Sequence, residues 1–300
     1  MTTRPEATEA LATIGHEYAQ ESLRVGELLK SRLTTLYQVP AGMTFAQYRE
    51  TVRFGSDTTE TSAHDATIEQ VPVRSFAPRT RSHGRYLHLH GGGWCLGSHT
   101  MHDATLQRLA DQSELTVTSV GYRMAPEHRY PACLEDVLAV AQALAGPTDD
   151  GLPFLAVGGE SAGAHLAAMA AVELPRRLGR QPFSAVSLNY GAFDLTTGLE
   201  RALALLMPDA GRAERADASP LRAELPGVPP ARFCVGTEDA LLLQTLAMEA
   251  KWRTRAPTEL DVFAGAAHAF TTVRCRAAQV AKAREAAFLR RQRTERWNQT

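Results

Sequence analysis

The chain has 300 residues, 44% of them hydrophobic, and a formal net charge of −1 at pH 7. A chain of this length and composition can build one large hydrophobic core without the help of metals or disulfides. The near-neutral charge leaves no basic stripe for nucleic acid or for an anionic membrane surface. Neither is therefore expected as a partner.

The cysteines and the first residues bear on the compartment. The four cysteines, at positions 95, 133, 234 and 275, have neither paired nor metal-like spacing, which is typical of a reducing environment. Arg4, Glu6 and Glu9 lie near the N-terminus without an apolar run, and no stretch approaches the length of a membrane span. These features predict a cytoplasmic protein without a signal peptide.

In chain order, the pattern begins with residues 6–33, which mix polar and apolar side chains at helical spacing. Strands are then predicted at 51–55, 68–76, 84–90, 115–121, 153–158, 183–190, 231–236 and 258–263. Helices are predicted at 99–112, 132–145, 161–177, 240–254 and 271–292. Strands that alternate with helices imply an α/β fold, with a mostly parallel sheet covered by helices on both faces.

The most informative motif is Gly-Glu-Ser-Ala-Gly at 159–163. An apolar run at 154–157 precedes it, and residues 164–171, rich in helix formers, follow it. A serine on a sharp turn between a strand and a helix has its hydroxyl lifted clear of the sheet, and such a turn needs small neighbours. Ser161 is therefore the candidate nucleophile, with an ordinary turn serine as the alternative.

Three consecutive glycines, Gly91 to Gly93, follow the strand predicted at 84–90 and precede Trp94. Glycines at a strand end let backbone N–H groups point into a cavity without side chains in the way. An acyl-transfer enzyme needs two or three such donors at the carbonyl oxygen of its substrate. The glycines thus predict an oxyanion-binding loop, and a merely flexible loop is the alternative.

These two motifs belong to a longer series. Between them stand Tyr-Arg-Met-Ala-Pro-Glu-His at 122–128, Tyr-Pro-Ala at 130–132 and Leu-Glu-Asp at 134–136, and after them come Ser-Pro-Leu at 219–221, Pro-Pro-Ala at 229–231 and His-Ala-Phe at 268–270. The series resembles the hormone-sensitive-lipase-like family of α/β-hydrolases over roughly residues 65–290. The resemblance implies an α/β-hydrolase fold with a small helical cap, and serine esterase chemistry.

The base and the acid follow the serine in the chain order of this fold. The histidines after Ser161 are His165 and His268. His165 projects along the nucleophile helix, whereas His268 stands in a small-residue loop after the strand at 258–263, which is a suitable place for a general base. His268 is therefore the preferred base.

The acid is expected in the turn after the strand at 231–236. By resemblance Asp239, 29 residues before the histidine, matches the catalytic aspartate of the family. Glu238 beside it is the rival, and Asp194 is a weaker one. Ala240 and Leu243 stand where the family usually has proline and a second aspartate, and Ala269 stands where it has glycine. None of these changes removes a chemical group from the triad.

The resemblance also implies the remaining site residues. The oxyanion hole is expected to consist of the N–H groups of Gly92, Gly93 and Ala162, with His90 anchoring the glycine loop. A substrate pocket is expected to contain Trp94, Leu96, Leu203 and Met207.

Other histidines and one cysteine receive a structural interpretation. His88 is interpreted as a hydrogen-bonded core residue, and Cys95 as a small buried residue rather than part of the pocket. His99 and His102 stand one turn apart, but no third ligand lies near them in the sequence. Neither a metal nor another cofactor is expected.

Two regions are expected to form the protein: an N-terminal helical part of the cap at 1–50, and a catalytic domain at 51–300. Within the latter, residues 192–231 correspond to the second cap segment of the family. This segment is shorter than usual, and residues 199–207 are expected to form one short helix there before Pro208.

The predicted function is hydrolysis of short-chain carboxylic esters through an acyl-enzyme intermediate. Hydrolysis of an amide or N-acetyl group, or tailoring of a natural product, is the first alternative. A non-catalytic small-molecule receptor is the second, although the presence of His268 argues against it. A small ester is the expected partner, and a homodimer is possible.

Overall fold

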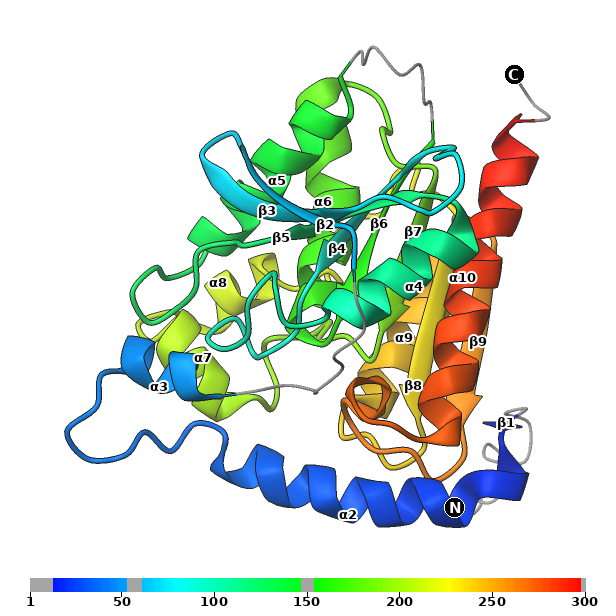
Figure 1. Ribbon diagram of the computed structural model, residues 1–300. Helices are drawn as coiled ribbons and strands as arrows, with labels where there is room; N and C mark the ends of the chain where they lie inside the picture. Colours follow the sequence, from blue (N-terminus) through cyan, green and yellow to red (C-terminus); the bar gives the residue numbers. More distant parts are fainter. Residues whose placement is uncertain (1–12, 53–60, 147–153, 298–300) are drawn as a thin grey trace, which may run out of the picture.

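The computed structural model describes residues 13–52, 61–146 and 154–297. These residues form one nine-stranded sheet with the strand order β1-β9-β8-β7-β6-β4-β5-β3-β2 (Figure 1). The strands from β1 to β5 in this order are parallel, and β3 and β2 continue the sheet in antiparallel fashion. The predicted α/β fold with a mostly parallel sheet is therefore confirmed.

The strands are β1 (Thr13–Ile14), β2 (Ala63–Ile68), β3 (Val71–Phe76), β4 (Arg85–Leu89), β5 (Thr116–Val120), β6 (Leu155–Glu160), β7 (Ala185–Asn189), β8 (Ala231–Gly236) and β9 (Thr258–Phe263). The α-helices are α2 (Ala19–Thr35), α3 (Phe45–Thr51), α4 (Asp103–Ser113), α5 (Ala132–Leu144), α6 (Ala162–Leu178), α7 (Glu200–Leu206), α8 (Arg212–Asp217), α9 (Leu242–Arg253) and α10 (Arg276–Trp297). Two 3-10 turns, η1 (His16–Tyr18) and η2 (Phe270–Thr272), complete the described elements.

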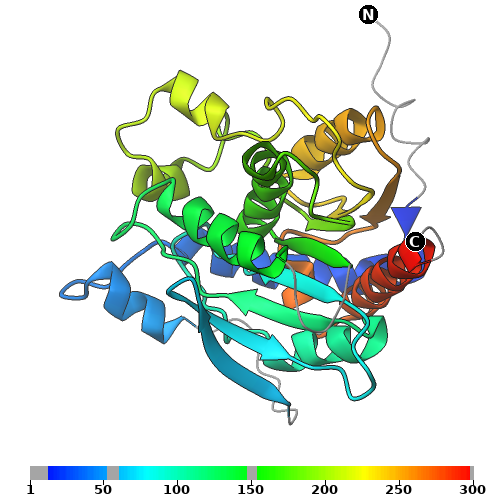
Figure 2. The same ribbon diagram turned by 90° about the horizontal axis from the view of Figure 1, so that it is seen from above.

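Helices cover both faces of the sheet. Helices α4 and α10 pack on one face, and α5, α6 and α9 pack on the other (Figure 2). Strands β4, β6, β7 and β8 are buried along their whole length, because they have neighbours on both sides and helices above and below. The alanine-rich α6 is buried over most of its length and packs closely on β6. The hydrophobic core thus surrounds the strand that carries the candidate nucleophile at its end.

The region predicted as one strand at 68–76 is instead a hairpin of β2 and β3. Glu69 and Gln70 connect the two strands, with φ angles of 49° and 65°. Two-residue hairpin turns of this kind require positive φ, and glycine or asparagine usually supplies it. Because neither residue type stands here, this turn has no signal at the level of sequence.

Two N-terminal predictions also need correction. Thr51 ends helix α3 rather than beginning a strand, and residues 53–55 of that predicted strand lie outside the described residues. The helix predicted at 6–33 begins at Ala19, and its residues 6–12 also lie outside the described part. Thr13 and Ile14 form a short strand that pairs with Val262 and Phe263 of β9. A segment expected in the cap therefore contributes an edge strand to the sheet.

Helix α2 runs across the carboxyl ends of the strands, and α3 and α7 lie at the same end of the molecule (Figure 1). The short helix expected at 199–207 is α7, and the segment 192–231 contains α8 as well. Among the helices of the described ranges, none is both long enough and apolar enough to cross a membrane.

Candidate active site

Ser161 lies at the junction of β6 and α6, in strained backbone geometry with φ 55° and ψ −113°. Its backbone N–H donates to the carbonyl of Asn189 at 2.9 Å. A Cβ atom added to Gly159 or Gly163 would lie only 2.1 or 1.8 Å from the carbonyl oxygen of Leu89. Glycine is needed at both positions because the end of β4 passes directly against the turn.

A continuous chain of hydrogen bonds joins the three predicted triad residues. The Oγ atom of Ser161 lies 2.9 Å from Nε2 of His268. The Nδ1 atom of His268 lies 3.0 Å from each carboxylate oxygen of Asp239. Because a carboxylate only accepts, Nδ1 carries the proton and Nε2 is left to accept from the serine hydroxyl. This is the tautomer that a general base for Ser161 requires.

Neighbouring strand ends hold the candidate acid and the candidate base in place. Asp239 follows β8, and the backbone N–H of Leu241 donates to its Oδ1 atom at 2.8 Å. His268 follows β9, and a hydrogen bond of 2.9 Å from the N–H of Glu238 to the carbonyl of Ala266 ties the two loops together. The carboxylate of Asp239 is buried, whereas one fifth of the His268 side chain is exposed to solvent. A substrate can therefore reach the imidazole but not the aspartate.

The rival acids face elsewhere. Glu238 points to the surface, where its carboxylate lies 3.6 Å from Nζ of Lys30. Asp194 forms an ion pair with Arg222 at 2.8 Å. Both carboxylates have other partners, and the structure brings Asp239 to the histidine.

The rival base His165 is buried below the site. Its Nε2 atom donates to the carbonyl of Ala218 at 2.7 Å, and its Nδ1 atom accepts from the indole N–H of Trp94 at 3.2 Å. Burial lowers the pKa of His165 to about 4. This histidine is thus a neutral core residue with both ring nitrogens bonded.

The glycine loop has the backbone shape that its sequence indicated. Gly92 and Gly93 have φ angles of 116° and 61°. A Cβ atom at Gly92 would lie 2.2 Å from the carbonyl oxygen of Leu96, so only glycine fits this turn. Within the described part of the chain, the N–H groups of Gly92, Gly93 and Ala162 donate no hydrogen bond. They remain available to an oxyanion, as an oxyanion hole requires.

His90 is fully buried at the start of this loop. Its Nδ1 atom donates to the carbonyl of Gly91 at 2.8 Å, and its ring stacks on Tyr122 with a centroid distance of 4.3 Å. The Tyr122 hydroxyl donates to the His90 carbonyl at 2.7 Å. Burial lowers the pKa of His90 to about 3, so the ring is neutral. These contacts have the geometry expected of a loop anchor.

Comparison with known proteins identifies the family. The family model for the alpha/beta hydrolase fold matches residues 86–272, which include Ser161, Asp239 and His268. The chain belongs to the α/β-hydrolase fold family. The membership predicted from the hormone-sensitive-lipase-like motifs is confirmed.

Solved structures of similar fold include several esterases. An esterase/lipase from an uncultured bacterium superposes with a TM-score of 0.75 at 24% identity, over 89% of this chain and 99% of its own. EstE5, soaked with p-nitrophenyl butyrate, superposes with a TM-score of 0.75 at 23% identity, over 89% of this chain and 99% of its own. EstE1, a thermostable carboxylesterase from a metagenomic library, superposes with a TM-score of 0.70 at 25% identity, over 91% of this chain and 97% of its own. The fold is thus shared over nearly the whole length of these enzymes.

All four residues expected in the substrate pocket of this α/β-hydrolase belong to the main hydrophobic core. Trp94, Leu96 and Leu203 are almost wholly buried there. Met207 lies at the edge of this core and lines a surface hollow between α5, α6 and α7. A contact between any of these side chains and a substrate therefore stays a prediction.

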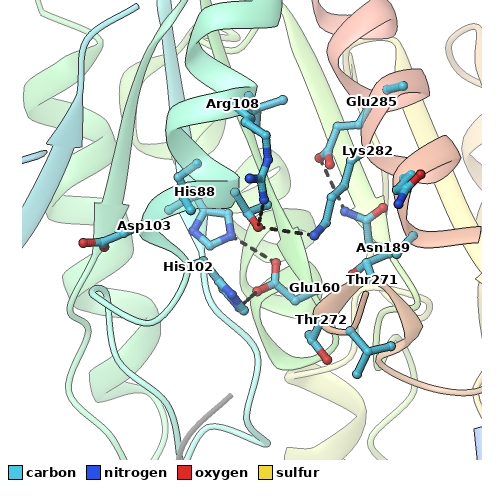
Figure 3. Close-up of a pocket in the computed structure, with 18 of the residues that line it drawn as sticks. His88, His102, Asp103, Arg108, Glu160, Asn189, Thr271, Thr272, Lys282 and Glu285 are labelled. Carbon is cyan, nitrogen blue, oxygen red and sulfur yellow. Dashed lines mark hydrogen bonds and ion pairs between the residues drawn. The ribbon is translucent and has the colours of Figure 1, made fainter. Parts of the chain in front are cut away.

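A cavity of about 410 Å³ lies on the face of the hydrolase sheet that α4 and α10 cover, between these two helices (Figure 3). His88, His102 and Glu160 line one side of it, and Lys282 and Glu285 of α10 line the other. The pKa of Lys282 is lowered, chiefly by its burial. Although Glu160 directly precedes Ser161, its side chain belongs to this cavity. The cavity thus lies behind the candidate triad of the hydrolase.

Sequence reasoning missed three residues that support the site. Glu160 accepts a hydrogen bond from the backbone N–H of Gly91 in the glycine loop. Arg49 of α3 donates to the carbonyls of Cys95 and Ala125 at 2.6 and 2.8 Å, and so secures the segment after the loop. The hydroxyl of Tyr37 lies directly against Gly93. Glu160 could have been found from the sequence, because a charged residue at the end of a buried strand is unusual. Arg49 and Tyr37 have no such signal, because the tertiary fold brings them to the loop.

His88 is a buried, hydrogen-bonded residue, with partners Ser119 and Glu160. Nε2 of His102 lies 3.0 Å from Glu160. Among the described residues, no three histidine, cysteine or acidic side chains are arranged to hold a metal ion. The cysteines at 95, 133, 234 and 275 are buried free thiols.

Proposed function

We propose that this α/β-hydrolase is a carboxylesterase-type serine hydrolase that cleaves short-chain carboxylic esters through an acyl-enzyme intermediate. The hydrogen-bonded chain from Ser161 through His268 to Asp239 carries the proposal. It stands beside backbone N–H groups that have no partner within the described residues. The esterases of similar fold support ester bonds as the substrate class.

In the acylation step, Oγ of Ser161 attacks the carbonyl carbon of the ester while its proton passes to Nε2 of His268. The carbonyl oxygen becomes an oxyanion and accepts hydrogen bonds from the N–H groups of Gly92, Gly93 and Ala162. Asp239 stabilises the imidazolium. The tetrahedral intermediate then expels the alkoxide, which takes the proton from His268 and leaves as the alcohol.

In the deacylation step, water takes the place of the alcohol. His268 removes a proton from the water as its oxygen attacks the acyl carbon. The second tetrahedral intermediate collapses, the Ser161 oxygen leaves and regains its proton from His268, and the carboxylic acid is released. The same N–H groups stabilise both oxyanions, so one site serves both halves of the reaction.

The preference for short acyl groups rests on packing. Trp94, Leu96 and Leu203 fill the core instead of opening an apolar tunnel. The segment 192–231 contributes only the short helices α7 and α8. Little apolar surface is therefore available to hold a long acyl tail. We expect kcat/KM to be highest for acyl groups of two to four carbons and to fall for longer chains.

A series of p-nitrophenyl esters with acyl groups from two to sixteen carbons tests this preference. An optimum at ten carbons or more would contradict it. A parallel series of anilides with the same acyl groups separates esterase from amidase activity. Faster turnover of the anilides would favour the amide or N-acetyl hydrolase. Slow turnover of every member would favour a tailoring enzyme with its own substrate.

The role of Ser161 is tested by Ser161→Ala. Loss of one hydroxyl oxygen changes the packing little, so the variant should fold with an unchanged melting temperature. Ester hydrolysis should fall by at least several powers of ten, since nucleophile removal abolishes the acyl-enzyme route. More than about a hundredth of the wild-type rate would contradict the assignment. No turnover by the wild type, with tight binding of a small molecule, would instead favour a receptor.

Buried free thiols suit a reducing compartment, and on this basis we place the protein in the cytoplasm. We also propose a homodimer, and analytical ultracentrifugation would measure its mass in solution.

A further inference from the structure

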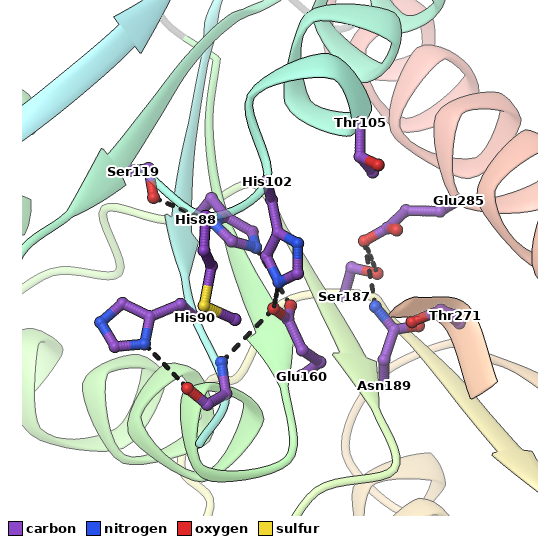
Figure 4. Close-up of polar contacts among 12 residues, drawn as sticks. His88, His90, His102, Thr105, Ser119, Glu160, Ser187, Asn189, Thr271 and Glu285 are labelled. Carbon is purple, nitrogen blue, oxygen red and sulfur yellow. Dashed lines mark hydrogen bonds and ion pairs between the residues drawn. The ribbon is translucent and has the colours of Figure 1, made fainter. Parts of the chain in front are cut away.

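Glu160 is a buried carboxylate at the end of β6, directly before the candidate nucleophile. Its Oε2 atom accepts a hydrogen bond of 3.0 Å from Nε2 of His88 (Figure 4). Its Oε1 atom lies 3.0 Å from Nε2 of His102 and accepts the backbone N–H of Gly91 at 3.3 Å. The two oxygens of one side chain thus meet groups from β4, from the start of α4 and from the glycine loop.

The contact with Gly91 joins the two halves of the site. Gly91 is the first of the three glycines, and the next two carry N–H groups proposed to bind the oxyanion. A Cβ atom at Gly91 would lie 3.0 Å from the Glu160 carbonyl and 3.6 Å from Cβ of Ser161. The loop therefore lies directly on the serine turn, and the Glu160 carboxylate is hydrogen-bonded to it there.

The carboxylate is ionised. Burial by itself raises the pKa of Glu160, but the facing imidazoles of His88 and His102 outweigh it, and the net pKa lies well below the usual range. Hydrogen bonds to an ionised acceptor are shorter and stronger than neutral ones. A buried charge bound on both oxygens holds its partners in one geometry, whereas an apolar side chain of similar size would let the loop shift.

We propose that Glu160 is a positioning residue that sets the oxyanion-binding loop against Ser161, by accepting the N–H of Gly91 while His88 and His102 fix its carboxylate. The inference rests on the proposed function. Glu160 does not itself touch the substrate, because its side chain lines the cavity behind the serine turn, and neither Ser161 nor His268 lines that cavity. Its effect is therefore expected on kcat, through the transition state, rather than on KM.

Glu160→Met tests this role, because methionine fills a similar volume but carries no charge, and its thioether is only a weak hydrogen-bond acceptor. A displacement of about 1 Å between catalytic groups lowers the rate on the order of a hundredfold. We expect kcat for p-nitrophenyl butyrate to fall by about that factor, with KM within threefold of the wild type. Glu160→Gln keeps an oxygen for Gly91, and its amide can donate to His88 once that ring changes tautomer. This variant should keep kcat within about tenfold of the wild type.

Glu285 supplies the matched control. It lines the same cavity and accepts hydrogen bonds from Tyr86 at 3.1 Å and Ser187 at 2.7 Å, but it makes no contact with the glycine loop. Glu285→Met and Glu285→Gln should lower the melting temperature while kcat stays within threefold. Should Glu160→Met fail to fold, Glu160→Ala carries the same expectation, because the cavity admits water to the two imidazoles.

Inhibition by n-butylboronic acid separates positioning from general destabilisation. Oγ of Ser161 adds to the trigonal boron as the hydroxyl proton passes to His268, and the resulting tetrahedral boronate anion imitates the transition state. Its Ki should rise in Glu160→Met by the same factor by which kcat/KM falls, and should stay unchanged in the Glu285 variants. The positioning role would be overturned if Glu160→Met folds and keeps kcat within threefold of the wild type, or if it loses kcat while Ki is unchanged. Either result would leave the proposed function standing. A wild type that neither hydrolyses esters nor binds the boronate would overturn the proposed function and the positioning role with it.

Discussion

At the scale of single residues, the site depends on which atoms carry protons. The carboxylate of Asp239 accepts from Nδ1 of His268, and this leaves Nε2 for the hydroxyl of Ser161. The order of the bonds is as important as their presence, because an imidazole with its proton on Nε2 cannot accept from the serine. The most informative substitutions are therefore those that keep the shape of a side chain but replace a hydrogen-bond acceptor by a donor.

Asp239→Asn is the first such substitution. Its amide N–H would donate to Nδ1 of His268 and move the ring proton to Nε2, so that the base is blocked. We expect kcat to fall by about four powers of ten with little change in KM, as seen for other triads. Glu238→Gln is the control, since Glu238 pairs with Lys30 at the surface, and its kcat should stay within threefold. Steady-state kinetics measure kcat of both variants. A large loss of kcat in Glu238→Gln with little loss in Asp239→Asn would mean that Glu238 is the acid.

Two buried histidines make stability depend on pH. Burial lowers the pKa of His90 to about 3 and that of His165 to about 4, from an ordinary value of 6.5. Between these values and 6.5 the unfolded chain binds protons at both positions and the folded chain does not. The free energy of unfolding should therefore fall as the pH falls below 6.5, by up to about 1.4 kcal/mol per pH unit for each histidine.

Urea unfolding at pH 7.5, 6.0 and 5.0 measures this slope. His165→Gln is the control variant, because a glutamine amide can accept from Trp94 and donate to Ala218 without titrating. Its unfolding free energy should fall less steeply over the same range, because unfolding of the variant takes up one proton fewer. Equal slopes for the wild type and the variant would show that His165 is protonated in the folded protein.

At the scale of elements, a buried ion pair fixes α10 to the sheet. Arg232 of β8 donates to Asp261 of β9 at 2.8 Å and to the carbonyl of Ala281 of α10 at 3.1 Å. Asp261 also accepts from Arg284 of α10 at 2.7 Å. The side chains of Arg232 and Asp261 are 0% and 1% exposed. The two strands that precede the candidate acid and the candidate base are thus joined to each other and to the helix covering them.

Asp261→Asn should destabilise the protein strongly, because it leaves the Arg232 charge buried without its counter-charge. We expect a loss of about 3 to 5 kcal/mol in the free energy of unfolding. The kcat of the folded fraction should be unchanged, since the pair lies away from the triad. Glu259→Gln on the same strand breaks a partly exposed pair with Arg291 and should cost less than about 1 kcal/mol. Similar losses in the two variants would contradict this account.

At the scale of the whole molecule, sequence reasoning found the parts of the fold that have local signals. The parallel strands appear as short apolar runs, and the turn at Ser161 as small residues between a strand and a helix. The roles assigned to Asp239 and His268 came from chain order and family resemblance, and the structure brings both side chains to the serine. These features depend on residue type and spacing, which the sequence displays directly.

The remaining features depend on tertiary contacts that the sequence does not display. The hairpin at Glu69 and Gln70 lacks the usual turn residues, and β1 is a strand only because β9 offers it an edge. The family resemblance predicts Trp94 beside the substrate, but Trp94 has a φ of 61° and its side chain packs into the core against His165. Because packing decides such positions, residue type alone could not place them.

The order of strands in the sheet has a consequence for biosynthesis. Strands β4 and β6 lie at its centre, and β7, β8 and β9 are added outward in the order in which a ribosome would release them. Ser161 and His268 are separated by 107 residues of chain. A nascent polypeptide can therefore form the serine turn early, yet it holds no base until β9 has emerged, and β1 waits for that same strand. The proposed hydrolytic activity would therefore appear late in translation, because it needs His268 from the loop after β9.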